Sequence, residues 1–260
     1  IAAAIQINNT VRLFDLSAPT IVESTLDSDN KKVTVKFSVP VYATAKAEGE
    51  IETDDFRLSI SGGSATLKSA NPSSIQSSEG GQLYQLGLEL VGIADGDEVL
   101  TISPVDNNIF DSAANPANKT QANNSVNLFD KQPPIITGVT LSSTNDTINV
   151  TLSEAVYSTS DTSGALEGSD FVLSILGGVA TLTNPTPASV SVSGNTYSLP
   201  FIIAGIPDGN EELKVLPSAN SIFDAAGNAS ELIQKNNSLY INDREPPAAP
   251  TGLVGVPGNT

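Results

Sequence analysis

The sequence contains no cysteine, histidine, methionine or tryptophan. Without cysteine and histidine, the chain has no disulfide bond, thiol nucleophile, imidazole general base or Cys/His metal site. Aromatic residues make up only 5% of the chain, so the stacking surface expected of a carbohydrate-cleaving site is missing as well. These absences exclude most hydrolytic and redox chemistry, and we expect the chain not to be an enzyme.

Basic residues are also scarce, with 12 lysines and arginines against 29 acidic residues and a net charge of −17. A surface of this sign argues against nucleic-acid binding and makes divalent cations the natural counter-partner. No apolar run approaches the roughly 18 residues that span a bilayer, and no signal-peptide pattern opens the chain. Because the rich content of Ser, Thr, Asn, Asp and Gly is typical of secreted bacterial surface proteins, we expect an extracellular location without membrane insertion of this fragment.

The chain contains an internal duplication. The segment that begins at Asp15 returns at Asp130 and again at Asp243, 115 and 113 residues later. Within each period, the sequence Asp-Phe-x-Leu-Ser-Ile-x-Gly-Gly-x-Ala-Thr-Leu begins at Asp55 and at Asp170, again 115 residues apart. A period of this length is that of one domain, so the sequence predicts two tandem domains of one kind.

Four stretches alternate apolar with polar residues at a period of two, which is the pattern of half-buried strands. They are residues 33–38, 84–90, 148–153 and 197–203. Gly, Pro, Asn and Asp clusters separate the runs and supply turns, and no segment has a sustained helical period. About seven short strands per repeat predict an all-β fold of tandem immunoglobulin-like β-sandwich domains, two in series.

Three motifs carry a family resemblance. Phe-Ser-x-Pro-Val-Tyr begins at Phe37, and its counterpart Leu-Ser-Glu-Ala-Val-Tyr begins at Leu152. Each is followed by Asp-Phe, and the second repeat closes with Ile-Phe-Asp-Ala-Ala-Gly-Asn from Ile222. This set resembles the bacterial Ig-like repeats of large cell-surface adhesins, including the repeats of swimming- and gliding-motility surface proteins. The resemblance implies a stalk of stacked repeats whose partners are neighbouring repeats, while domains outside this fragment contact surface glycans or other cells.

The repeat pattern also predicts what flanks the two domains. Gln-Ile-Asn-Asn-Thr-Val from Gln6 matches the end of each repeat, and the proline-rich tail from Pro246 resembles the opening of a fibronectin type III module. We therefore expect the last strand of a preceding Ig-like repeat at 1–14, Ig-like repeats at 15–129 and 130–243, and a linker with the start of a fibronectin type III-like module at 244–260.

The Ig-type topology is expected to gather polar side chains at one end of the second repeat. They are Asp130 in the linker, Glu154 after the second strand, Asp170 at the start of the third strand, and Asp224 with Asn228 in the last loop. Because crowded carboxylates repel and Ca²⁺ takes six to eight oxygen ligands, the sequence predicts calcium at this place. The alternative is that these residues form only turns, with Asx side chains capping backbone groups.

The first repeat enters this prediction in two ways. Its turn with Asp95 and Asp97 precedes the sixth strand, and we expect that turn at the opposite end of the first repeat, facing the junction. At its own entry, however, Val39 stands where the second repeat has Glu154, so a site around Asp15 has lost one charged ligand. Calcium is therefore predicted at the junction between the repeats, with Asp95 and Asp97 contributing to it.

The function predicted from the sequence is that of an extracellular structural spacer. One alternative is a glycan- or cell-surface-binding Ig-like module, and another is an accessory domain of a secreted enzyme. Repeated binding sites would share exposed residues, yet loops 43–53 and 158–168 share little beyond one glycine. This divergence favours the spacer over the binding module.

Overall fold

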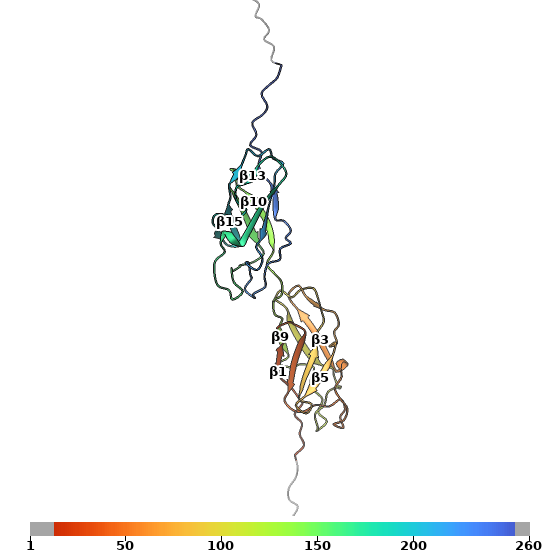
Figure 1. The fold of residues 1–260 in the computed structure, drawn as a ribbon. Helices are drawn as coiled ribbons and strands as arrows, with labels where there is room; N and C mark the ends of the chain where they lie inside the picture. The colour runs from red at the N-terminus through yellow and green to blue at the C-terminus, as the bar shows by residue number, and fades with distance from the viewer. Residues whose placement is uncertain (1–12, 253–260) are drawn as a thin grey trace, which may run out of the picture. The chain divides into compact units, whose positions relative to one another are not determined.

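A computed structural model describes residues 13–252 of the chain. The chain divides between Gln132 and Pro133 into two units, and each unit is a β-sandwich, as predicted (Figure 1). Among the described residues the only helical segments are two 3₁₀ turns. The strand predicted at 1–14 falls, for residues 1–12, outside the described part, and so do residues 253–260 of the predicted fibronectin-like module.

The first unit has two main sheets and a small ribbon, all antiparallel. One sheet has the order β1-β2-β6-β5, the other β3-β8-β9, and β4 pairs with β7. This is the A-B-E-D and C-F-G arrangement of an immunoglobulin-type sandwich. The elements are β1 (Ile21–Leu26), β2 (Lys32–Phe37), η1 (Thr53–Asp55), β3 (Phe56–Ser61), β4 (Thr66–Leu67), β5 (Ile75–Ser78), β6 (Leu83–Gly87), β7 (Leu90–Val91), β8 (Val99–Pro104) and β9 (Ser125–Asn127).

The second unit repeats the same architecture. Its sheets have the orders β10-β11-β15-β14 and β12-β17-β18, with β13 paired to β16. Strand for strand this is the order of the first unit, as a duplication requires. The elements are β10 (Ile136–Leu141), β11 (Thr147–Leu152), η2 (Gly168–Asp170), β12 (Phe171–Leu176), β13 (Thr181–Leu182), β14 (Ser191–Ser193), β15 (Thr196–Pro200), β16 (Ile203–Ala204), β17 (Glu212–Pro217) and β18 (Ser238–Tyr240).

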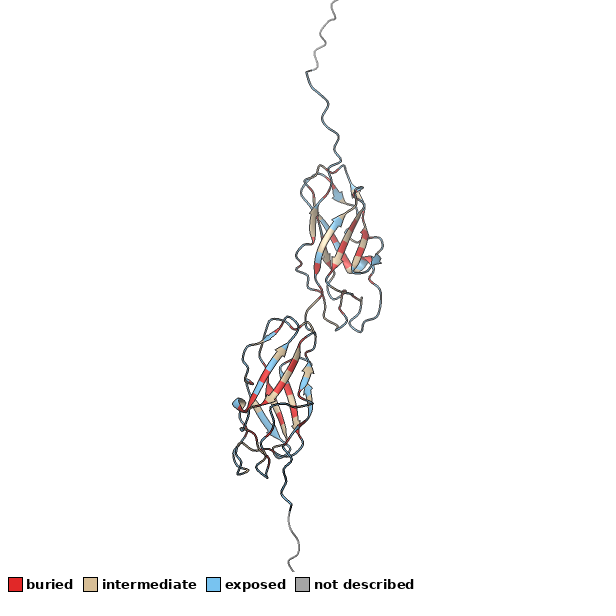
Figure 2. Ribbon diagram, turned by 180° about the vertical axis from the view of Figure 1, so that it is seen from behind, coloured by how far each residue is buried: buried red, intermediate tan, exposed pale blue. Residues whose placement is uncertain are grey.

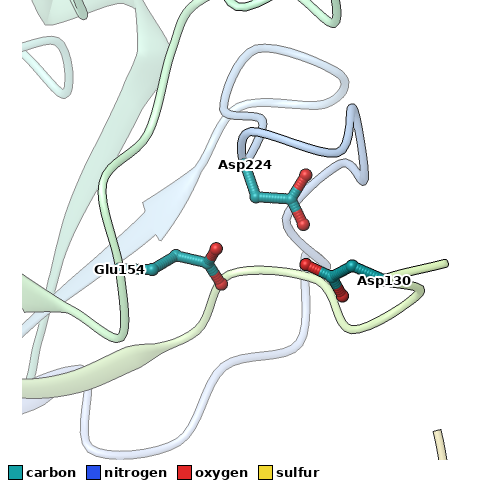
Figure 3. Close-up of side chains that lie close together, drawn as sticks. All are labelled: Asp130, Glu154 and Asp224. Carbon is teal, nitrogen blue, oxygen red and sulfur yellow. The ribbon is translucent and has the colours of Figure 1, made fainter. Parts of the chain in front are cut away.

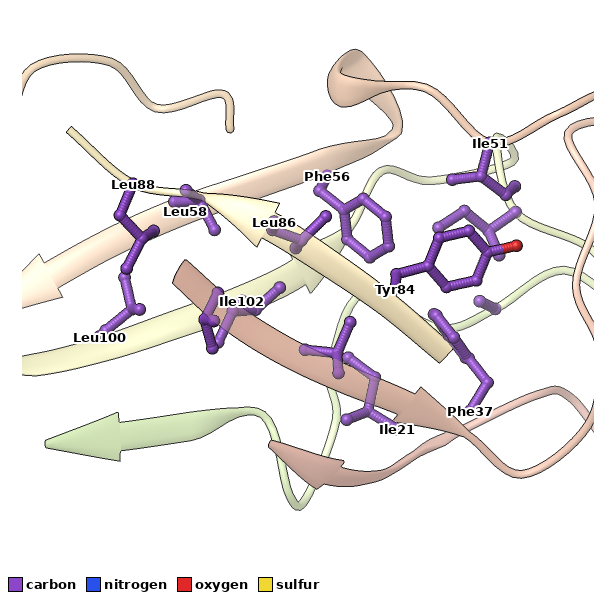
Figure 4. Close-up of a cluster of buried hydrophobic side chains, with 14 of the residues drawn as sticks. Ile21, Phe37, Ile51, Phe56, Leu58, Tyr84, Leu86, Leu88, Leu100 and Ile102 are labelled. Carbon is purple, nitrogen blue, oxygen red and sulfur yellow. The ribbon is translucent and has the colours of Figure 1, made fainter. Parts of the chain in front are cut away.

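Each sandwich is held together by the inward faces of its two sheets (Figure 2). In the first unit, three aromatic rings from β2, β3 and β6 meet inside the core (Figure 4). The ring centroids of Phe37, Phe56 and Tyr84 are 6.1–6.2 Å apart, and the two phenylalanines are fully buried. The alternation predicted for β2 therefore points one side-chain set into the core, where apolar burial stabilises the fold.

Two strand predictions, one in each repeat, were wrong in extent. The alternating run 84–90 was expected to be one strand, but β6 ends at Gly87 and β7 begins at Leu90. At the break, the Gly87 N–H donates to the Ser74 carbonyl at 2.9 Å, and the Leu88 N–H donates to the Lys31 carbonyl at 2.7 Å. Leu88 remains buried across the break. The apolar periodicity thus continues while the chain changes its strand partner, and 197–203 is divided in the same way into β15 and β16.

Candidate functional site

Three carboxylates predicted as calcium ligands come together in the structure. Ligand-type oxygens of Asp130, Glu154 and Asp224 all lie within 4.8 Å of one another (Figure 3). Asp130 belongs to the segment after β9, Glu154 follows β11, and Asp224 lies in the loop between β17 and β18. Asp224 is fully buried, whereas the other two are half-buried. Carboxylate oxygens grouped in this way are ligands that hard cations such as Ca²⁺ accept.

The loop around Asp224 fixes the direction of its carboxylate. Its Oδ1 accepts hydrogen bonds from the backbone N–H groups of Ala226 at 2.8 Å and Asn228 at 2.7 Å, and its Oδ2 accepts one from Asn228 Nδ2 at 2.7 Å. Gly227 closes this turn at a φ of +82°, where a β-carbon would lie 2.9 Å from the Ser160 carbonyl oxygen. A β-carbon at this position would be strained, which favours glycine here.

Asp130 also takes part in a turn. Its Oδ1 accepts the N–H of Gln132 at 2.8 Å, and its two counterparts do the same: Asp15 accepts from Ser17 at 2.9 Å, and Asp243 from Glu245 at 2.7 Å. The Asx-turn interpretation therefore describes all three repeated aspartates. Because an ionised carboxylate has about four lone-pair sites on two oxygens, this turn role does not prevent Asp130 from acting as a ligand.

The structure places the other predicted acidic ligands outside the group of three. Asp170 Oδ2 accepts the N–H of Glu167 at 2.7 Å and caps the turn η2, and burial raises the pKa of Asp170. Asp95 Oδ1 accepts the N–H of Asp97 at 3.2 Å, which is again turn chemistry. The carboxylate group found among residues 13–252 includes none of these three.

The first repeat keeps the loop but changes one member of the set. Asp111 accepts the N–H groups of Ala113 and Asn115 at 2.8 Å each, as Asp224 does with its own loop. At the position that corresponds to Glu154, however, stands the partly exposed Val39. The first repeat therefore has the same loop around its aspartate but lacks the carboxylate that Glu154 provides in the second repeat.

A pair of buried glutamates was not recognised as such from the sequence. Glu98 and Glu211 have no solvent exposure, and each accepts four backbone N–H groups. For Glu211 the donors are Val179 and Ala180 at 2.9 Å each, Asp208 at 3.3 Å and Gly209 at 3.1 Å. For Glu98 they are Ser64 at 2.9 Å, Ala65 at 2.7 Å, Asp95 at 3.3 Å and Gly96 at 3.1 Å. Each glutamate thus joins two loops of its sandwich.

The hydrogen bonds decide the protonation of Glu211. Burial raises its pKa, but the backbone N–H groups of Ala180 and Val179 outweigh burial and lower the pKa to about 2. A carboxylate that accepts several backbone N–H bonds is expected to behave in this way. The sequence does contain a signal: Gly-Gly-x-Ala and Asp-Gly-x-Glu recur in both repeats, and turn chemistry alone does not require the glutamate.

No protein-family profile and no curated protein matches the chain. Among solved structures, it is similar to the N-terminal part of the bacterial S-layer protein SbsC, with 16% identity, a TM-score of 0.31, and coverage of 79% of this chain and 42% of that one. For the S-layer protein rSbsC(31-844) the values are 17%, 0.32, 87% and 26%. The chain spans less than half of either S-layer chain, and a similarity at this level does not establish a function.

Among residues 13–252, no helix has the length and apolarity needed to cross a bilayer.

Proposed function

We propose that the two repeats are structural spacers of a large bacterial surface adhesin, acting outside the cell to give reach and stiffness. One observation carries this proposal: the two sandwiches keep the same buried framework while their exposed loops diverge. A spacer needs its fold and its joints, and it tolerates differences on its surface. Each sandwich adds on the order of 40 Å of reach, from strands and loops at about 3.3 Å per residue.

The buried framework matches position by position. Phe56 and Phe171, Tyr84 and Tyr197, and Leu100 and Leu213 are core residues at corresponding places in the two repeats. On the surface, by contrast, the Lys68–Glu89 ion pair of 2.6 Å has Thr183 and Ile202 as its counterpart in the second repeat. Selection for a common ligand would be expected to preserve exposed residues rather than only buried ones.

Calcium at Asp130, Glu154 and Asp224 belongs to this proposal as the cation that stiffens the stalk. The support is the separation of at most 4.8 Å between their oxygens and the complete burial of Asp224. Like charges at this distance repel, and a divalent cation removes the repulsion. The calcium prediction is tested separately below, because the spacer proposal does not depend on it.

The experiment that tests the spacer proposal exchanges the repeats within the full-length protein on its native cells. Residues 15–243 are replaced by two unrelated cysteine-free β-sandwiches of the same length, and a second variant lacks the segment. A spacer predicts that adhesion survives the exchange and falls with the deletion, while antibodies against the segment label intact cells.

Other outcomes identify the alternatives. Loss of adhesion after the exchange, with the protein still displayed at the surface, would assign ligand binding to the repeats themselves. Adhesion that is unchanged in both variants would contradict the spacer and favour an accessory domain of a secreted enzyme. Absence of antibody labelling on intact cells would contradict the extracellular location.

A further inference from the structure

The chain leaving the first sandwich is held by a buried asparagine. Asn30, in the turn between β1 and β2, donates from Nδ2 to the Phe129 carbonyl at 2.7 Å and accepts the Phe129 N–H on Oδ1 at 2.9 Å. Asn30 is only 4% exposed, and its backbone is left-handed with a φ of 58°. This pair of bonds ties the segment after the last strand to a turn almost one hundred residues earlier.

The turn that contains Glu98 also forms hydrogen bonds with this segment. The Leu128 N–H donates to the Glu98 carbonyl at 3.0 Å, and the Lys131 N–H donates to the Ala94 carbonyl at 2.8 Å. The side chain of Glu98 in turn accepts the N–H of Gly96, between those two acceptors. Residues 128–131 are therefore fixed by the Asn30 turn and the Glu98 turn together, an arrangement we call the exit clamp.

The second sandwich has the same exit clamp. Asn145 donates to the Asn242 carbonyl at 2.7 Å and accepts its N–H at 3.1 Å, and the Ile241 N–H donates to the Glu211 carbonyl at 2.9 Å. The Arg244 N–H donates to the Pro207 carbonyl at 2.8 Å. The clamping Asn and Glu are identical in the two repeats, whereas the clamped residues differ in type.

The chain entering the second sandwich is fixed almost immediately afterwards. The Pro134 carbonyl accepts the Ser230 hydroxyl at 2.9 Å, and the Ile135 N–H donates to the Ser153 hydroxyl at 3.1 Å. Between Lys131, the last residue of the exit clamp, and Pro134 lie only Gln132 and Pro133. Proline fixes its own φ, and a following proline restricts the residue before it.

We propose that the exit clamp stiffens the joint between repeats independently of calcium, with Asn30 and Glu98 as positioning residues for the outgoing chain. The clamp leaves Gln132 and Pro133 as the hinge and requires no metal ion. Its use as a stiffener rests on the proposed spacer function, but the clamp itself is testable without it. The closest comparison is internal, because Asn145 and Glu211 do the same for the chain that leaves the second repeat.

The test replaces one asparagine at a time by glycine in the full chain, in the presence of EDTA. Glycine adopts the left-handed φ of Asn30 without strain, so Asn30→Gly removes the side-chain hydrogen bonds and keeps the turn. The readout is amide hydrogen exchange at Lys131 and Arg244, whose N–H groups donate to the Ala94 and Pro207 carbonyls and not to an asparagine side chain. Two lost hydrogen bonds predict about ten- to a hundredfold faster exchange. We expect this faster exchange at Lys131 in the Asn30→Gly variant and at Arg244 in the Asn145→Gly variant.

If each variant speeds exchange only in its own repeat, the asparagine positions the outgoing chain and the effect is not a general loss of stability. If Asn30→Gly speeds exchange equally at Lys131, Arg244 and the core strand β8, the asparagine is merely structural and the proposal is overturned. Unchanged exchange at Lys131 in a folded Asn30→Gly protein overturns it as well. Failure of the spacer proposal would appear in the cell experiment and leave these exchange rates as predicted.

Discussion

The carboxylate of Glu211 occupies the space that a β-carbon on Gly178 would need, and Glu98 does the same at Gly63. Gly178 has a φ of +60° and Gly63 a φ of +59°, so these glycines are required both by their backbone conformation and by the carboxylate beside them. Because each glutamate is sealed from solvent by two loops, the Gly-Gly pair and the distant Glu form one structural unit in each repeat.

We expect Gly178→Ala to destabilise the second sandwich by about 2–4 kcal/mol, from backbone strain together with displacement of a buried carboxylate. The matched control is Gly194→Ala. Gly194 has a φ of +58°, but no atom lies within 4 Å of its β-carbon position, so strain alone predicts about 1–2 kcal/mol there. Chemical denaturation of both variants measures the difference. Equal losses of stability would contradict the close contact between Gly178 and Glu211.

The low pKa of Glu211 predicts a pH dependence with a definite sign. Its pKa in the folded chain is about 2, below the ordinary value of 4.5. The ionised carboxylate therefore stabilises the fold above about pH 4.5, and this contribution is lost as the pH falls towards 2. We expect the free energy of unfolding of Glu211→Gln to fall furthest below that of wild type at neutral pH. This difference should become smaller as the pH is lowered. Denaturation curves at a series of pH values measure it.

Asp170 provides an internal check on this sign. Burial raises its pKa, so protonation of Asp170 favours the folded state as the pH falls. Asp170→Asn should lack this stabilising effect of acid. The advantage of wild type over Asp170→Asn in the free energy of unfolding should therefore grow as the pH falls, whereas its advantage over Glu211→Gln should shrink. The Glu211 prediction also has a contradicting outcome. If the difference in the free energy of unfolding between wild type and Glu211→Gln stays constant from neutral pH to pH 2, hydrogen bonds to the ionised carboxylate do not stabilise the two loops that Glu211 joins.

The calcium prediction is tested best by giving the second repeat the residue that the first repeat has at the position of Glu154. Glu154→Val copies Val39 into the second repeat, and we expect it to abolish a calcium-dependent rise in melting temperature while the sandwich stays folded. A site occupied at a hundredfold excess over its dissociation constant adds about 2.7 kcal/mol to the free energy of unfolding. Melting in EDTA and in millimolar calcium measures this difference.

The controls for the calcium experiment are variants outside the carboxylate group. Asp97→Ala should keep the full calcium effect, because Asp97 is not among the three carboxylates, while Asp130→Ala should lose it. Identical melting of the unchanged chain in both buffers would contradict calcium binding. Asp130 and Asp224 would then act only within their turns, and the spacer would depend on its exit clamps and prolines.

Much of the fold could be predicted from the sequence because both of its signals are local. The alternation from Val33 to Phe37 specifies a half-buried strand, and repetition of the same pattern specifies the number of domains. The break at Gly87 could not be predicted in this way, because Leu88 continues the apolar period while backbone pairing moves to another strand. Periodicity reports which face a side chain takes, and it does not report its hydrogen-bonding partner.

The site shows the same limit more strongly. The topology argument predicted that Asp130, Glu154 and Asp224 meet at one end of the sandwich, but it also included Asp170, which caps the turn η2 instead. Glu98 directly follows the turn of Asp95 and Asp97 in the sequence, and it is fully buried. Its role depends on N–H groups from a loop more than thirty residues away, such as Ala65, and no local pattern encodes that approach.

The most direct test of the central claim, that these repeats form a stiff spacer, is a distance distribution between the two sandwiches. The chain has no natural cysteine, so Thr66→Cys and Thr181→Cys, at exposed positions of the two small ribbons, place one spin label on each sandwich. Pulsed electron spin resonance in EDTA should give one narrow distribution, and Asn30→Gly should broaden it. A broad distribution in the otherwise unchanged chain would contradict the account.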